Sequence, residues 1–131
     1  MKIYTSYFGN WSVLQNNNIK IISIALHPPL DFINAKLIEL APTQETRYKL
    51  FISKDEYIKS FKAQLSLLDF SIIYKKIENI SDGKDVALLC YEKPDDICHR
   101  HLVADWLNSN LSYKVKEYKN KKIKNIKGEE K

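Results

Sequence analysis

The stretch KDVALLCYEKPDDICHRHLVADWLNSN, Lys84 to Asn110, decides the fold class of this chain. Its first part, KDVALLCYE, has an uninterrupted apolar centre, which is typical of a strand covered on both faces of a sheet. Its last part, CHRHLVADWLNSN, has apolar residues at helical spacing, namely Leu102, Val103, Trp106 and Leu107. A buried strand that leads into an amphipathic helix is a building unit of α/β domains.

The rest of the chain adds elements of the same two kinds. We expect strands at 2–8 and 19–26, helices at 53–69 and 72–80, and a short edge strand at 113–118; residues 31–47 read as irregular, with a short helix around AKLIEL. Ser53 and Glu56 are spaced as a capping box. The prediction is a single compact α/β domain over residues 1–113, with a small, mainly parallel sheet flanked by helices, followed by an edge strand and a Lys-rich tail over residues 114–131.

The charge of the chain is concentrated in that tail. Residues 114–131 hold eight lysines and three glutamates, which gives +5, and the whole chain has a formal net charge of +5, so the remainder sums to zero. The tail has one aromatic residue, Tyr118, and no arginine. A solvated, partly disordered terminus is the simplest reading, and contact with a nucleic acid through the tail is the alternative.

Composition also predicts the compartment. The first ten residues lack the features of a signal peptide, and no apolar run is long enough to cross a bilayer. Cys90 and Cys98 are expected to be reduced, as in cytoplasmic proteins. We therefore expect a cytoplasmic protein without a membrane partner.

Polar side chains follow each of the three main predicted strands. In a parallel sheet these positions meet at the carboxyl edge, which is where open α/β sheets bind ligands. The side chains that would converge there are Thr5, Ser6, Tyr7, His27, Tyr91 and Glu92.

The segment Cys98-His99-Arg100 opens the last predicted helix. Cys98 and His99 should face the sheet, and Arg100 should lie at the flank of the buried stripe. A helix N-terminus favours an anion, an arginine fork binds phosphate or carboxylate, and the same field lowers the pKa of a cysteine thiol. Glu92 is the candidate for acid–base work, Cys98 for the nucleophile and His99 for a base.

Structural roles are the alternatives for the same residues. Cys98 could be an inert buried residue, His99 a hydrogen-bonded core residue, and Arg100 the ion-pair partner of Glu92 or Asp96. The spacing of the cysteines and histidines fits no zinc site, and the sequence has no Gly-rich phosphate loop, so we expect neither metal nor cofactor.

The segments CYEKPDDICHRHLVADWL, IYTSYFGN and ISIALHPP together resemble the bacterial and phage family named domain of unknown function 488. The resemblance spans residues 3–110 and implies a site built from Thr5, Ser6, Tyr7, Cys90, Glu92, Cys98, His99 and Arg100, with LAP at 40–42 as a further family segment. Family members often have an arginine in or just after the second strand, where this chain has Leu26 and His27. The resemblance implies a fold and a site but names no reaction.

Three functions remain open from the sequence. The first is a site for a small anionic ligand, a nucleotide or sugar phosphate, at the carboxyl ends of the strands, with catalysis left open. The second is a non-catalytic nucleic-acid module that uses the basic tail. The third is an interaction protein in which the Cys98-His99-Arg100 segment only fixes the helix to the sheet.

Overall fold

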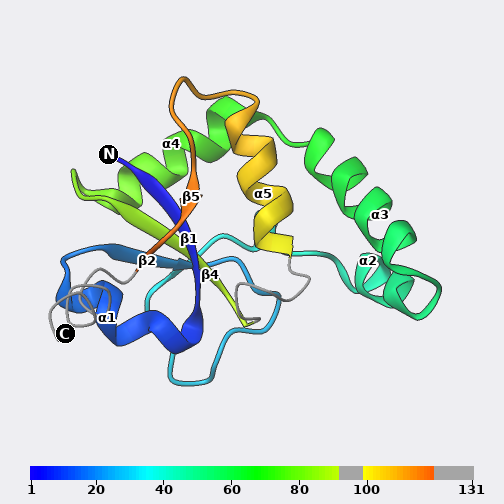
Figure 1. Cartoon of the computed structure of the whole chain (residues 1–131), viewed down its shortest axis with the longest axis horizontal. Helices are drawn as coiled ribbons and strands as arrows, with labels where there is room; N and C mark the ends of the chain where they lie inside the picture. The colour runs from blue at the N-terminus through cyan, green and yellow to red at the C-terminus, as the bar shows by residue number, and fades with distance from the viewer. Residues whose placement is uncertain (92–98, 120–131) are drawn as a thin grey trace, which may run out of the picture.

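Five parallel strands form one sheet, in the order β3-β2-β4-β1-β5, in the computed structural model of the chain, which describes residues 1–91 and 99–119 (Figure 1). The strands are β1 (Ile3–Tyr7), β2 (Lys20–Ser23), β3 (Ala35–Lys36), β4 (Val86–Cys90) and β5 (Lys116–Glu117). The chain is a single α/β domain, as predicted, and its sheet is parallel throughout.

Helices cover both faces of this sheet. They are α1 (Trp11–Asn16), α2 (Gln44–Tyr48), α3 (Lys54–Ser66), α4 (Phe70–Ser81) and α5 (His99–Asn108), with 3-10 turns at Phe8–Asn10, Ile38–Leu40 and Lys49–Phe51. The larger core packs α3, α4 and α5 against one face, and the smaller core packs α1 against the other. Figure 1 shows these helices on opposite sides of the strands.

The central strand β4 is covered on both faces, which confirms the prediction from its apolar run. Val86, Leu88 and Cys90 belong to the larger core, whereas Ala87 and Leu89 belong to the smaller one. Side chains alternate between the faces of a sheet, so a central strand with a helix layer on each face needs apolar residues at every position.

The helix predicted after Ser53 is α3, and its start is built as the sequence indicates. The Ser53 hydroxyl accepts a hydrogen bond from the Glu56 backbone N–H, at 3.1 Å. Tyr57, Phe61 and Leu65 form its buried stripe. The next predicted helix is also present, as α4, and it ends at Asp82 and Gly83, both of which have positive φ.

Replacing Ser53 with alanine removes this N-cap and should lower the free energy of unfolding by about 1 kcal/mol. Urea denaturation at pH 7 would measure the difference. Ser66→Ala is the matched control, because Ser66 lies at the other end of α3 and donates to the Ala63 carbonyl instead of capping. Equal losses in the two variants would contradict the capping role.

The helices and strands of residues 8–47 differ most from the predicted ones. In the segment AKLIEL, Ala35–Lys36 is a short strand because the exposed edge of β2 offers backbone partners to it, and Ile38–Leu40 is a 3-10 turn at the place of the predicted short helix. β2 itself ends at Ser23, three residues before the predicted end. Helices α1 and α2 have six and five residues, too few to show a helical period in the sequence.

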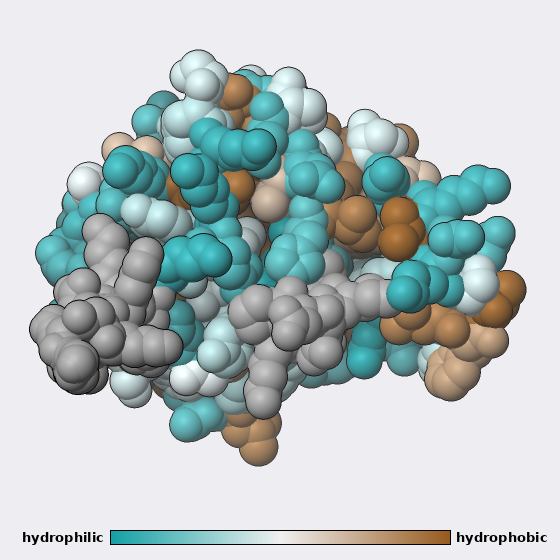
Figure 2. All heavy atoms as spheres, in the orientation of Figure 1, coloured by the Kyte–Doolittle hydropathy of each residue, from teal (hydrophilic) through white to brown (hydrophobic). Residues whose placement is uncertain are grey.

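The last strand lies at the sheet edge, as predicted. β5 pairs in parallel with β1, with Tyr4 opposite Lys116 and Thr5 opposite Glu117. Hydrophilic side chains cover β5 in Figure 2, so this edge faces solvent. No helix in the described ranges is long and apolar enough to cross a membrane.

Candidate functional site

Arg100 lies in the first turn of α5 with its whole side chain buried, at 0% exposure. The buried residues of α5 are His99, Arg100, Val103, Ala104 and Leu107. The expected position of Arg100 at the flank of the stripe is therefore wrong. The helix is rotated so that Arg100 faces the sheet, while Leu102 and Trp106 are only partly buried. Such burial requires an anionic partner for the guanidinium.

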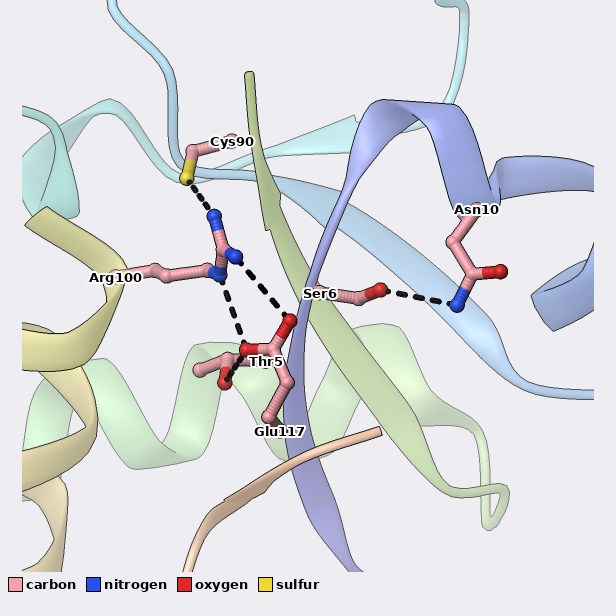
Figure 3. A network of polar contacts seen from close by, with 6 residues as sticks. All are labelled: Thr5, Ser6, Asn10, Cys90, Arg100 and Glu117. Atoms are coloured by element: carbon pink, nitrogen blue, oxygen red, sulfur yellow. Dashed lines mark hydrogen bonds and ion pairs between the residues drawn. The ribbon is translucent and has the colours of Figure 1, made fainter. Parts of the chain in front are cut away.

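Glu117 of β5 is that partner. Arg100 Nε donates to Glu117 Oε1 at 3.1 Å and Nη2 donates to Oε2 at 3.2 Å, which is a two-bond fork (Figure 3). Thr5 Oγ1 also donates to Oε1, at 2.9 Å. Thr5 and Glu117 face each other in the register of β1 and β5, so their side chains lie on the same side of the sheet as α5.

Cys90, at the carboxyl end of β4, completes this cluster. Arg100 Nη1 donates to Cys90 Sγ at 2.9 Å. Cys90 is disulfide-bonded, so the expectation of two reduced cysteines is wrong; the partner sulfur lies outside the described residues. A disulfide sulfur is only a weak hydrogen-bond acceptor and offers no thiol proton.

The buried pair places two charges in a site of low polarity. Removing an ion pair from water costs more free energy than a hydrophobic pair of similar size would, so such a pair is weak evidence for stability. The Glu117 side chain is 20% exposed, whereas that of Arg100 is fully covered. The cluster of Arg100, Glu117, Thr5 and Cys90 therefore meets solvent on the Glu117 side, at the end of β5 and beside the middle of β1.

His99 lies beside this cluster in a second buried position. Its Nε2 is 2.6 Å from the Ile24 carbonyl oxygen, just after β2, and its ring packs edge-to-face on Phe61. Burial lowers the pKa of His99 to about 4, helped by the positive charges of Arg100 and Arg47 and opposed by the Ile24 hydrogen bond. The imidazole is therefore neutral at pH 7, and Nε2 donates its proton to Ile24 O.

A second polar group lies on the opposite face of the sheet. Ser6 is buried and its hydroxyl accepts a hydrogen bond from Asn10 Nδ2 at 3.2 Å. Figure 3 shows the Ser6 side chain pointing away from Arg100.

The Tyr91 hydroxyl donates to the His27 carbonyl oxygen at 2.6 Å. This contact uses the backbone of His27, not its imidazole.

Tyr7 is half-buried at the end of β1, with Gly9 against its ring. A Cβ at Gly9 would lie 2.8 Å from Tyr7 Cε2, so a larger residue would displace the ring. Gly9 therefore leaves room for the Tyr7 ring in this position.

The structure thus divides the predicted site residues into two groups. Thr5, His99 and Arg100 lie on the α5 face, and Ser6, His27 and Tyr91 contribute to the other face. Glu92 and Cys98 lie outside the described residues, as do Asp96 and the tail from residue 120.

Sequence reasoning missed two charged residues. Glu117 was hidden in the predicted edge strand, and only the pairing of β5 with β1 brings it to Arg100. Arg47 lies on α2, and its charge acts on His99. Arg47 and Arg100 are the two arginines of the chain, and that rarity is the one signal that could have drawn attention to Arg47.

Within residues 1–91 and 99–119, no three His, Cys, Asp or Glu side chains gather closely enough to hold a metal ion. The DUF488-N3a family model, described as the active DUF488-N3 subclade, matches residues 15–111. That range includes β2 to α5 and therefore His99 and Arg100. No curated protein and no solved structure matches the chain.

Proposed function

Because the chain belongs to the DUF488-N3a family, we propose that it uses the carboxyl edge of its sheet, in the way open α/β domains do, to bind a small anionic ligand. The ligand class is a nucleotide or a sugar phosphate. The observation that carries this proposal is the Arg100 fork, buried in the first turn of α5 with a carboxylate already bound to two of its nitrogens.

The hydrogen bonds that the Arg100 guanidinium makes support an anion as the ligand. Glu117 is an acceptor of the chemical kind that a phosphate or carboxylate supplies, which indicates that the guanidinium is oriented for such groups. Nη1 donates to the Cys90 sulfur, and an anionic oxygen would be a stronger acceptor than that sulfur. The α5 N-terminus adds a positive field in the same place.

Arg47 supports the same ligand class. Its charge lowers the pKa of His99, so its positive potential extends to the buried site. The family resemblance implies an arginine near the second strand, where this chain has Leu26 and His27; we propose that Arg47 supplies the corresponding charge from α2.

A nucleotide is favoured over a plain sugar phosphate by the aromatic residues at this edge. Tyr7 is half-buried and Tyr91 is 52% exposed, at the ends of β1 and β4. Tyr91 also contacts Phe8, with ring centroids 4.9 Å apart. Tyr7 lies two residues after Thr5 in β1 and therefore on the same face as Arg100, so its ring can stack on a base while Arg100 holds the phosphate.

We extend the proposal to catalysis, because the matching family is described as active. With a pKa of about 4, His99 is a weak proton acceptor at pH 7, so we assign it a positioning role through its Ile24 contact. Glu92 remains the proposed acid–base residue, and the disulfide bond of Cys90 removes the support for a cysteine nucleophile, since the chain has two cysteines.

A thermal-shift panel of nucleotides and sugar phosphates tests the binding site. A ligand at 100 times its Kd should stabilise the protein by about 2.7 kcal/mol. Arg100→Lys keeps the charge but loses the fork, and should weaken binding about 10–100-fold, since a hydrogen bond to a charged group contributes about 1.5–3 kcal/mol.

Lys62→Arg is the matched control, because it also keeps one positive charge and changes only the head group of an exposed side chain on α3. It should leave the ligand response unchanged. A ligand that stabilises wild type and Arg100→Lys equally would refute the site. A panel in which no compound stabilises the wild type would refute the ligand class.

A further inference from the structure

Four of the five parallel strands have a lysine at their first residue or within the two residues before it. Since the strands all run in one direction, their starting points meet at one edge of the sheet, opposite the Arg100 cluster. We call this region the amino edge; its lysines are Lys2 before β1, Lys20 at the start of β2, Lys84 before β4, and Lys114 and Lys116 before and in β5. Figure 2 shows hydrophilic side chains over β5.

The amino edge contains two neighbouring cavities that share Tyr4. One, of about 510 Å³, is lined by Tyr4, Lys2, Lys114, Lys116 and Tyr113, among others. The other, of about 500 Å³, includes Tyr4, Tyr118, Lys84 and Asp85. A third cavity, of about 200 Å³, lies beside Lys20 and Lys84. Each of these three cavities is therefore lined by at least one lysine.

Tyrosines line the two larger cavities. Tyr4 and Tyr118 pack edge-to-face, with ring centroids 5.2 Å apart, which fixes both rings in position. Burial and the neighbouring Tyr74 raise the pKa of Tyr113 to about 12, so its hydroxyl remains a neutral donor. Fixed rings between cationic side chains are the arrangement used to stack bases and hold phosphates.

Acidic residues at this edge are fewer than the lysines. Asp85 lines one cavity, where its carboxylate accepts from the Lys2 backbone N–H at 2.8 Å, and Asp82 ends α4 nearby in the chain. Glu117 is held by Arg100 on the other side of the sheet. The amino edge is therefore positive overall.

We infer that the amino edge is a binding surface for single-stranded nucleic acid, with phosphates on Lys2, Lys84, Lys114 and Lys116 and bases against Tyr4 and Tyr118. This surface is separate from the proposed ligand site and uses folded residues, not the tail. Single strands are favoured over duplexes and membranes because only unpaired bases can enter the cavities and stack on the tyrosines.

Fluorescence anisotropy with a labelled 20-nucleotide oligothymidylate, at 50 to 200 mM NaCl on the full chain, tests this inference. The edge variant replaces Lys2, Lys84, Lys114 and Lys116 with glutamine. The slope of log K against log salt should become shallower by up to about 3, since each phosphate contact with a single strand contributes about 0.7. Tyr118→Leu should weaken binding about tenfold, and Tyr118→Phe should retain it.

The control variant replaces four exposed lysines of α3 and α4 with glutamine, namely Lys54, Lys59, Lys62 and Lys75. It has the same net charge as the edge variant and should keep the wild-type slope. Equal losses in the two variants would overturn the inference, as would wild-type binding by the edge variant, which would leave the tail as the contact. Equal binding to phosphatidylglycerol vesicles, with no effect of Tyr118→Leu on either probe, would also overturn it.

Discussion

Arg100→Met is expected to lower the free energy of unfolding by about 3–5 kcal/mol, because it leaves the Glu117 carboxylate without its partner in a mostly covered site. The lower end of that range applies, since Glu117 is partly exposed and can regain some hydration. Urea denaturation at pH 7 measures the loss. The result would show how far the fold depends on an ion pair formed between its last helix and its last strand.

A double-mutant cycle separates the pair from ordinary packing. The variant Arg100→Met with Glu117→Leu replaces both charges by apolar groups, and should be more stable than Arg100→Met alone. Additive losses from the two substitutions would contradict the coupling that the two hydrogen bonds indicate. Recovery of stability without recovery of ligand binding would show that the charges are kept for function.

The second expected result concerns pH. His99 has a pKa of about 4 in the fold, against about 6.5 in the unfolded chain, so the unfolded state binds a proton first as the pH falls. The stability that depends on the neutral imidazole is fully present above pH 6.5 and is lost as the pH falls towards 4. The loss is about 3 kcal/mol, from 1.36 kcal/mol per pKa unit.

Denaturation of wild type and His99→Gln at several pH values between 7 and 4 would measure this loss. The glutamine amide can still donate to the Ile24 carbonyl but does not titrate, so its stability should change less with pH. His101→Gln is the matched control, because it removes the next histidine and leaves the Ile24 contact intact. Parallel curves for wild type and His99→Gln would disprove the buried neutral imidazole.

Carboxylates also contribute to the pH dependence of stability, and they do so equally in wild type, His99→Gln and His101→Gln. The Lys76 hydrogen bond lowers the pKa of Glu39, so the contribution of Glu39 is present above its usual value of 4.5 and declines below it. The difference between wild type and His99→Gln removes this background, because Glu39 is unchanged in both.

Both results bear on the proposed ligand site. Arg100 and His99 are adjacent in the chain, yet Arg100 reaches the edge strand β5 and His99 reaches the end of β2. The first turn of α5 therefore contacts the sheet on both sides of the central strand β4, at the end of β2 and at β5. A ligand at the carboxyl edge would bind between these connections, which keeps the contacting groups in fixed positions.

The sequence by itself determined the α/β class, the buried central strand and the helix that follows Ser53. It did so because a strand covered on both faces must be apolar at every position, and a helix with one buried face shows its period over thirteen residues. It also drew attention to Thr5, His99 and Arg100, which the structure places on the same face of the sheet.

The tertiary structure alone decided how those residues are connected. Glu117 is seventeen positions from Arg100 in a lysine-rich segment, and nothing local marks it as an ion-pair partner. Only the parallel pairing of β5 with β1 places Glu117 opposite Thr5, and only the rotation of α5 turns the Arg100 fork towards both. Strand order and helix rotation depend on packing between distant segments, which local pattern and charge do not encode.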